Sequence, residues 1–112
     1  MEILTRLEEM FLLTILQLGE DASLVTIRKH LVRHAGKDWA FGSLYMALSN
    51  MERKDLVRSQ LGEPRGGRGG RAVKTYRVTD DGLAALAETK RVHDALWRGF
   101  PASRLKEAAD EK

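Results

Sequence analysis

Apolar residues recur every three or four positions over residues 4–18, which predicts an amphipathic first helix that ends at Gly19. Its main apolar stripe consists of Leu4, Leu7, Phe11, Ile15 and Leu18. A second apolar set lies beside this stripe and consists of Leu12, Leu13 and Leu16. A helix that buries only one face would not be apolar over so much of its circumference. Either this helix is central to the core, or it also packs against a partner chain.

Two further helices are predicted over residues 24–35 and 41–54. Ser23 is a suitable N-cap for the first of them, and Gly36 a suitable C-terminal residue. Its inward face consists of Leu24, Ile27 and Leu31. The inward face of the next helix consists of Leu44, Leu48 and Met51. The other faces of that helix carry Ser43, Met46, Ala47, Ser49 and Asn50. Such a mostly small, polar surface fits a DNA major groove, and it is equally typical of a solvated helix face.

A β-hairpin is predicted next, with strands over residues 56–63 and 72–78, because the second segment alternates with a period of two. The intervening segment, PRGGRGGR, contains a proline and four glycines, which prevent regular structure and let the backbone approach another surface closely. Its arginines, Arg65, Arg68 and Arg71, recur at every third position. We expect them to follow a phosphate backbone or enter a minor groove.

A fourth helix is predicted from Thr79, its N-cap, to about residue 100, with acidic residues in the first turn where the helix dipole favours them. Leu83 and Leu86 are expected to pack on the domain. A later stripe, which we expect to pair with another subunit, consists of Thr89, Val92, Leu96 and Phe100. Pro101 ends the helix, and the charged tail is expected to be frayed.

The predicted fold is therefore mainly α with a small β-hairpin, in the order of a winged helix-turn-helix. Residues 1–78 form the winged helix-turn-helix domain, residues 79–100 a C-terminal dimerisation helix, and residues 101–112 the tail. At 112 residues the chain is long enough for one core. Its longest apolar runs are too short to cross a membrane, and the N-terminus lacks the order of a signal peptide.

Positive charge is concentrated around the hairpin. Between Arg53 and Arg77 there are eight Arg or Lys and two acidic residues, a local charge of +6, whereas the whole chain carries +3. A basic helix and hairpin on a slightly acidic body indicate a protein that binds a polyanion.

Catalytic and metal chemistry have little support in the sequence. The absence of cysteine excludes disulfides, thiol nucleophiles and thiolate metal sites. His30 and His34 have the i, i+4 spacing of a metal-binding pair, but no third ligand is evident. The glycine run lacks the Lys-Ser/Thr of a phosphate-binding loop. We expect no enzyme activity, no metal and no cofactor.

The segments GSLYMALSNMERKDLV and LGEPRGGRGGRAVKTYRVTDDGLAAL resemble the PadR-like family of transcriptional regulators. The residues that carry this resemblance are Gly42, Leu44, Tyr45, Leu48, Leu56, Val57, Gly70, Arg71, Tyr76, Thr79, Gly82 and Leu86. The likeness extends over about residues 4–98 and is closest to the short branch, which has a single C-terminal dimerisation helix. It implies a cytoplasmic, dimeric repressor that binds a pseudo-palindromic duplex DNA operator and is often released by a small ligand. The chain departs from the family at Leu24-Val25, where many relatives have Gly-Tyr.

We hypothesise that the third helices of a dimer enter successive major grooves. The expected DNA contacts are Ser43, Tyr45, Ser49, Asn50, Arg53, Lys54, Arg65, Arg68, Arg71 and Lys74, with Arg28 and Lys29 as further backbone contacts. The hairpin with its glycine–arginine loop is called the wing below. Tyr45 has an alternative position, half-buried under this wing. The expected homodimer interface consists of Leu12, Leu13, Leu16, Val92, Leu96 and Phe100. Trp97 either fills that interface or, paired with its copy, lines a pocket for a flat aromatic effector.

Two other functions remain open on the sequence alone. The arginine–glycine stretch RGGRGGR could bind single-stranded RNA, although two units between strands make a short tract. A winged helix could also serve protein interaction without nucleic acid. Competition between duplex DNA and single-stranded RNA separates the first from DNA binding, and failure to bind any duplex at low salt favours the second.

Overall fold

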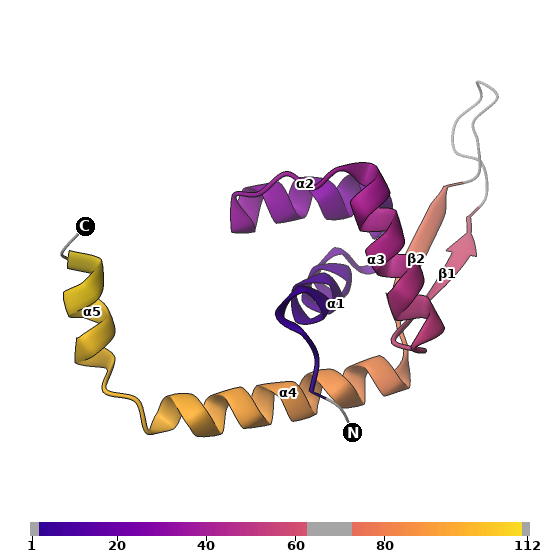
Figure 1. The fold of residues 1–112 in the computed structure, drawn as a ribbon. Coiled ribbons are helices and arrows are strands. Elements are labelled where there is room, and N and C mark those ends of the chain that lie inside the picture. Colours follow the sequence, from indigo (N-terminus) through magenta and orange to yellow (C-terminus); the bar gives the residue numbers. More distant parts are fainter. Residues whose placement is uncertain (1–2, 63–72, 111–112) are drawn as a thin grey trace.

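The computed structural model of the chain describes residues 3–62 and 73–110 (Figure 1). Its elements are α1 (Arg6–Leu18), the 3-10 turn η1 (Gly19–Asp21), α2 (Leu24–Ala35), α3 (Phe41–Arg53), β1 (Val57–Leu61), β2 (Lys74–Val78), α4 (Asp80–Arg98) and α5 (Ala102–Asp110). The predicted fold class is confirmed: the described chain is mainly helical, with one antiparallel hairpin. The ends of helices α1 to α4 lie within two residues of their predicted positions, whereas the tail after α4 differs from its prediction, as described below.

Local capping explains where the first helices begin and end. The Thr5 hydroxyl accepts a hydrogen bond from the Glu8 N–H (3.1 Å), while the Glu8 carboxylate accepts one from the Thr5 N–H (2.9 Å). Ser23 caps α2 in the same reciprocal way with Thr26, as its sequence position predicts. Gly36 ends α2 at a φ of +68°, a left-handed conformation that glycine adopts without steric cost.

The core lies between α1, α2, α3 and the inner face of the hairpin. The largest side chains with almost no exposure are Phe11, Leu12, Ile27, Leu44, Leu48, Met51, Val57 and Thr89. Leu12 thus belongs to the core of its own chain, and its predicted place in a dimer interface is wrong. The exposed apolar residues of α1 are Leu7, Leu13 and Leu16. One face of α1 therefore serves the core, and a neighbouring face is left uncovered.

The base of the hairpin is fastened to the body on both sides. β1 and β2 pair from Val57–Val78 at the base to Leu61–Lys74. The Tyr76 N–H donates to the Ala22 carbonyl (2.8 Å), which joins β2 to the segment before α2. On the other side, the Leu56 N–H donates to the Met51 carbonyl of α3 (2.9 Å), directly before β1 begins. These bonds fix the direction in which the hairpin leaves the body.

Helix α4 runs beneath the three-helix body, and its C-terminal part extends past it (Figure 1). The Thr89 hydroxyl is fully buried and accepts a hydrogen bond from the Leu4 N–H (2.9 Å). The expectation that Thr89 faces another subunit is therefore wrong. The expectation that Leu83 packs on the domain is also wrong, since it is 44% exposed, and the buried residues of this turn are Gly82 and Ala85.

The segment after Pro101 differs from its prediction. It was expected to be frayed, but it contains helix α5, which forms because Ala102–Asp110 has neither glycine nor proline and is rich in helix-forming residues. No residue of α5 is buried against the rest of the described chain. This helix turns away from α4 and makes no part of the core (Figure 1).

Candidate nucleic-acid interface

Helix α3 has one buried face and one free face. Leu44, Leu48 and Met51 are buried, and this fixes the opposite face outward. Among the predicted contact residues of that face, Ser43, Tyr45, Asn50 and Arg53 are exposed and Ser49 is half-buried. Together with the neighbouring strand residue Lys74, this free face of α3 is called the α3–wing surface below. It is the side of the helix that can approach a second molecule.

The hairpin, which forms the wing, is connected to α3 through a lysine that lies over two tyrosine rings. The ammonium of Lys74 on β2 lies 5.5 Å from the ring centre of Tyr45 on α3 and 5.8 Å from that of Tyr76. Burial, together with the nearby Glu52 and Tyr45, raises the pKa of the Tyr76 phenol. Tyr45 remains 46% exposed, so its ring lies beside the wing strand without being covered by it. The structure therefore brings Tyr45 and Lys74 together, as a shared binding surface requires.

The basic residues at the end of α3 have partners within the chain. Arg53 donates a hydrogen bond to the Asn50 side-chain oxygen. Lys54 forms an ion pair with Glu8 of α1 (2.8 Å), so its ammonium is turned toward α1. Burial works to raise the pKa of Glu8, but hydrogen bonds from Lys54 and Thr5 outweigh it and hold the pKa below its usual value. This pairing gives Lys54 a structural role that the sequence pattern does not reveal.

Arg28 also has an internal partner. Its guanidinium binds both carboxylate oxygens of Asp38, at 2.6 and 3.0 Å, and lies 4.4 Å from the centre of the Phe41 ring. Hydrogen bonds from Arg28 lower the pKa of Asp38. Arg28 thus joins α2 to the turn before α3, and nothing in this arrangement directs it toward a phosphate. Lys29, predicted with it, is exposed.

The predicted wing arginines Arg65, Arg68 and Arg71 lie outside the described residues. Within the described part of the hairpin, Arg58 and Arg77 are exposed and stand directly opposite each other on β1 and β2. Sequence reasoning did not single out either of them, because their proximity depends on the strand register. It also left Met46 out of the contact set, although Met46 is 57% exposed on the free face of α3.

A sequence profile of the transcriptional regulator PadR-like family matches residues 12–88, which is more than half of the chain. The chain belongs to this family. A search of curated proteins found no significant match. The PadR family regulator of Eggerthella lenta is 28% identical, with a TM-score of 0.64, and the match covers 91% of this chain and 85% of that one.

Two other solved structures show the same PadR-like fold. The PadR-like regulator of Bacillus cereus has a TM-score of 0.67 at 24% identity, over 92% of this chain and 90% of that chain. The PadR family regulator of Clostridium difficile has a TM-score of 0.60 at 25% identity, over 81% and 90%. The winged-helix arrangement of this regulator is thus shared with structures of the same family.

The residues predicted to form a dimer interface are mostly exposed in this PadR-like chain. Leu13 and Leu16 of α1 are 42% and 44% exposed, and Leu96 near the end of α4 is 72% exposed. Val92 is half-buried within the chain, and Phe100 is exposed. These apolar surfaces lie on the two helices that the sequence pattern assigns to subunit contact.

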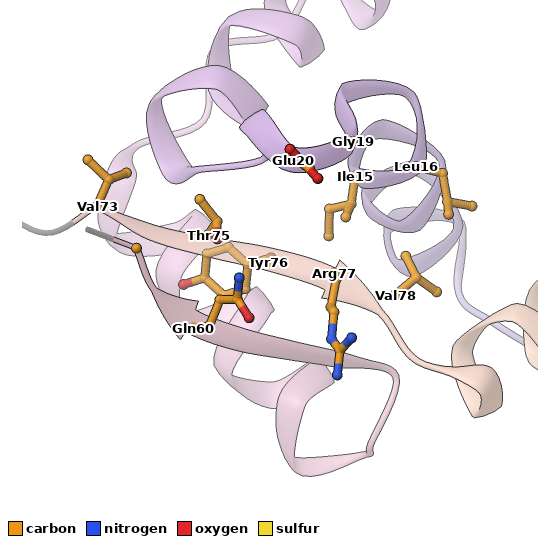
Figure 2. A pocket seen from close by; sticks show the side chains of 11 residues that line it. Ile15, Leu16, Gly19, Glu20, Gln60, Val73, Thr75, Tyr76, Arg77 and Val78 are labelled. Atoms are coloured by element: carbon orange, nitrogen blue, oxygen red, sulfur yellow. The ribbon is translucent and has the colours of Figure 1, made fainter. Parts of the chain in front are cut away.

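Among the hollows on the described residues, one lies at Trp97, where an effector was expected, and another is larger. Leu96, Trp97 and Phe100 line one of about 200 Å³, where the Trp97 and Phe100 rings meet edge to face at 5.7 Å. A larger hollow of about 860 Å³ lies between the end of α1, η1 and the hairpin (Figure 2). Ile15 and Leu16 border it on one side, and Thr75 and Arg77 on the other. No pattern in the sequence indicated this second hollow, because its walls come from segments that are distant in the chain.

The histidine pair is close in space. The rings of His30 and His34 are 4.3 Å apart, and the Nε2 of His30 lies 2.6 Å from the Gln17 side-chain oxygen. Burial and the neighbouring His34 and Arg33 lower the pKa of His30. Over residues 3–62 and 73–110, no group of three or more His, Asp or Glu side chains is placed to hold a metal ion. Nor does any helix in those ranges have the length and apolar character needed to cross a membrane.

Proposed function

We propose that this PadR-like regulator is a homodimeric repressor that binds a pseudo-palindromic duplex operator. The observation that carries the proposal is the α3–wing surface: a helix face free of internal packing, with Lys74 of the wing strand held beside it through Tyr45. In a winged helix-turn-helix protein, the corresponding helix enters the major groove and reads base edges. Family membership supports the role of transcriptional regulator.

The proposed contacts divide by chemistry. Ser43, Tyr45, Ser49 and Asn50 present hydroxyl and amide groups that can bind base edges. Arg53, Lys74 and the arginines of the glycine-rich loop supply positive charge for phosphates and the adjacent minor groove. Two α3 helices about one DNA turn apart would read two half-sites, which is why the operator is expected to be pseudo-palindromic.

Dimerisation is proposed through the exposed apolar residues of α1 and α4. In this contact, Leu96 of the partner's α4 and Phe100 just after that helix would cover Leu13 and Leu16. Each such contact would remove four exposed apolar side chains from water. An effector site is proposed beside this contact at Trp97, whose 55% exposed ring is not used in it and would face its copy in the partner. Quenching of tryptophan fluorescence by flat aromatic compounds, lost in Trp97→Ala, supports that site. An unchanged signal across a broad panel argues against it.

Binding to duplex DNA as a function of salt tests the proposed DNA contacts. Each phosphate contact contributes about 0.9 to the slope of log K against log salt. Replacing Arg65, Arg68 and Arg71 by Ala should therefore flatten the slope. Replacing Arg91, Arg98 and Arg104 by Ala removes the same charge outside the α3–wing surface and should change the slope much less.

The outcomes of this experiment are distinct. Failure to bind any duplex at low salt contradicts the proposed function. An equal slope for the wing triple variant and the wild type removes the wing from the proposed contacts while leaving α3 in place. Preference for single-stranded RNA over duplex DNA in direct competition would reassign the arginine–glycine loop to RNA.

A further inference from the structure

Met46 is an unusual residue for the middle of the α3–wing surface. It is 57% exposed, more than any other large apolar residue of α3. Residues four positions apart lie on the same face of a helix, so Gly42 precedes Met46 on the surface and Asn50 follows it. A flexible thioether side chain thus stands between a position without a side chain and an amide. More than half of its surface is left uncovered by the described chain.

Gly42 beside it is not required by the packing of the protein. A Cβ added at Gly42 would meet no atom within 4 Å. Glycine is unfavourable inside a helix, because it loses more conformational freedom on folding than alanine does. Side chains on a helix lean toward its N-terminus, so the space that Gly42 leaves open adjoins the side chain of Met46. Met46 is thus an apolar side chain next to a part of the helix surface that carries no side chain.

The polar residues on either side of Met46 have partners within the chain. The side-chain oxygen of Asn50 accepts a hydrogen bond from Arg53, one turn further along α3. Tyr45, on the other side, is held beside Lys74. Met46 therefore lies in the middle of the face with no polar partner of its own.

We infer that Met46 reads the C5-methyl group of a thymine in each half-site, and that Gly42 lets the helix approach closely enough for this contact. The inference rests on the proposed function. The methyl group of thymine is the apolar group that a base edge presents in the major groove, and an apolar side chain recognises it by excluding water. A thioether cannot replace a hydrogen-bonding side chain at any other base edge. Met46 would thus specify thymine at one position per half-site.

Uracil replacement tests this inference, because uracil differs from thymine only by the methyl group. Duplexes that bind the full-length protein are first selected from a random pool. Each thymine of the selected operator is then replaced by uracil, symmetrically in both half-sites. We expect one position at which replacement weakens binding about three- to fivefold for each half-site, as burial of one methyl group predicts. Met46→Ala and Met46→Gln should bind the thymine and uracil duplexes equally.

The control variant is Leu105→Ala, which removes a similarly exposed apolar side chain from α5, and it should keep the full thymine preference. If no duplex sequence is enriched from the pool, the proposed function fails and the inference fails with it. If an operator is enriched but every uracil replacement is neutral, the inference is wrong while the proposed function stands. A uracil effect that persists in Met46→Ala assigns the methyl contact to another residue and likewise overturns the inference.

Discussion

Gly82 in the first turn of α4 is expected to tolerate no side chain. A Cβ at this position would lie 2.8 Å from Val78 Cγ1 and closer still to the carbonyl oxygen of Leu56. Favourable contacts between carbon atoms are about 3.5–4.0 Å long, so α4 would have to move away from the hairpin base. The Leu56 carbonyl also accepts the Thr79 N–H (3.0 Å), and this bond would lengthen with the movement.

The size of the effect follows from two costs and one opposing gain in the free energy of unfolding. Forcing an extra methyl group into a packed site costs about 1–3 kcal/mol, and weakening one hydrogen bond adds about 1 kcal/mol. Replacing glycine by alanine in a helix returns up to about 1 kcal/mol. Gly82→Ala should therefore lower the free energy of unfolding by about 2 kcal/mol. Gly42→Ala is the matched control, since it lies in the first turn of α3 without a clash and should raise stability by about 0.5–1 kcal/mol.

Urea unfolding at pH 7, followed by circular dichroism at one fixed protein concentration, measures both variants. With a slope of about 1–3 kcal/mol per molar urea, the midpoints of the two variants should differ by about 1 M or more. The fixed concentration matters because association of chains would shift the midpoint. A Gly82→Ala protein with a midpoint equal to or above that of the wild type would refute the argument. An equal loss in Gly42→Ala would show that glycine at these helix starts is needed for another reason.

Two further predictions concern polar contacts with α1 and the residues before it. Thr89→Val keeps the shape of the side chain but leaves the buried Leu4 N–H without an acceptor. It should lower the free energy of unfolding, measured by heat or urea, by about 1–3 kcal/mol, whereas Thr89→Ser, which keeps the hydroxyl, should lower it less. The pKa of Glu8 is lowered in the folded state, so its ion pair with Lys54 stabilises the fold at pH values above the unfolded pKa of about 4.3. This stabilisation is lost as the pH falls through the folded pKa. Glu8→Gln should therefore be less stable than the wild type at pH 7 and nearly equal to it at pH 3; a constant difference at both pH values contradicts this.

Local signals in the sequence determined the order and the ends of most elements. Ser23, Gly36 and Thr79 cap their helices through bonds to residues at most four positions away, so their roles can be read without the fold. The second strand follows from its alternation, and its pairing with the first follows from their closeness along the chain. The free face of α3 was predictable for the same reason, because a helix that buries Leu44 and Leu48 must present its opposite side outward.

Contacts between distant residues were decided only by the tertiary structure. The apolar pattern of α1 predicts two faces, but only the packing of α2, α3 and β2 decides that Leu12 is buried while Leu13 and Leu16 are exposed. Thr89 meets the Leu4 N–H across 85 positions of the chain, and Lys54 meets Glu8 across 46. Periodicity describes one element at a time, whereas these contacts depend on the relative placement of two elements. The sequence therefore determined which surface of α3 is exposed. The tertiary structure decided which basic residues near that surface pair with acidic residues of the same chain, as Arg28 and Lys54 do.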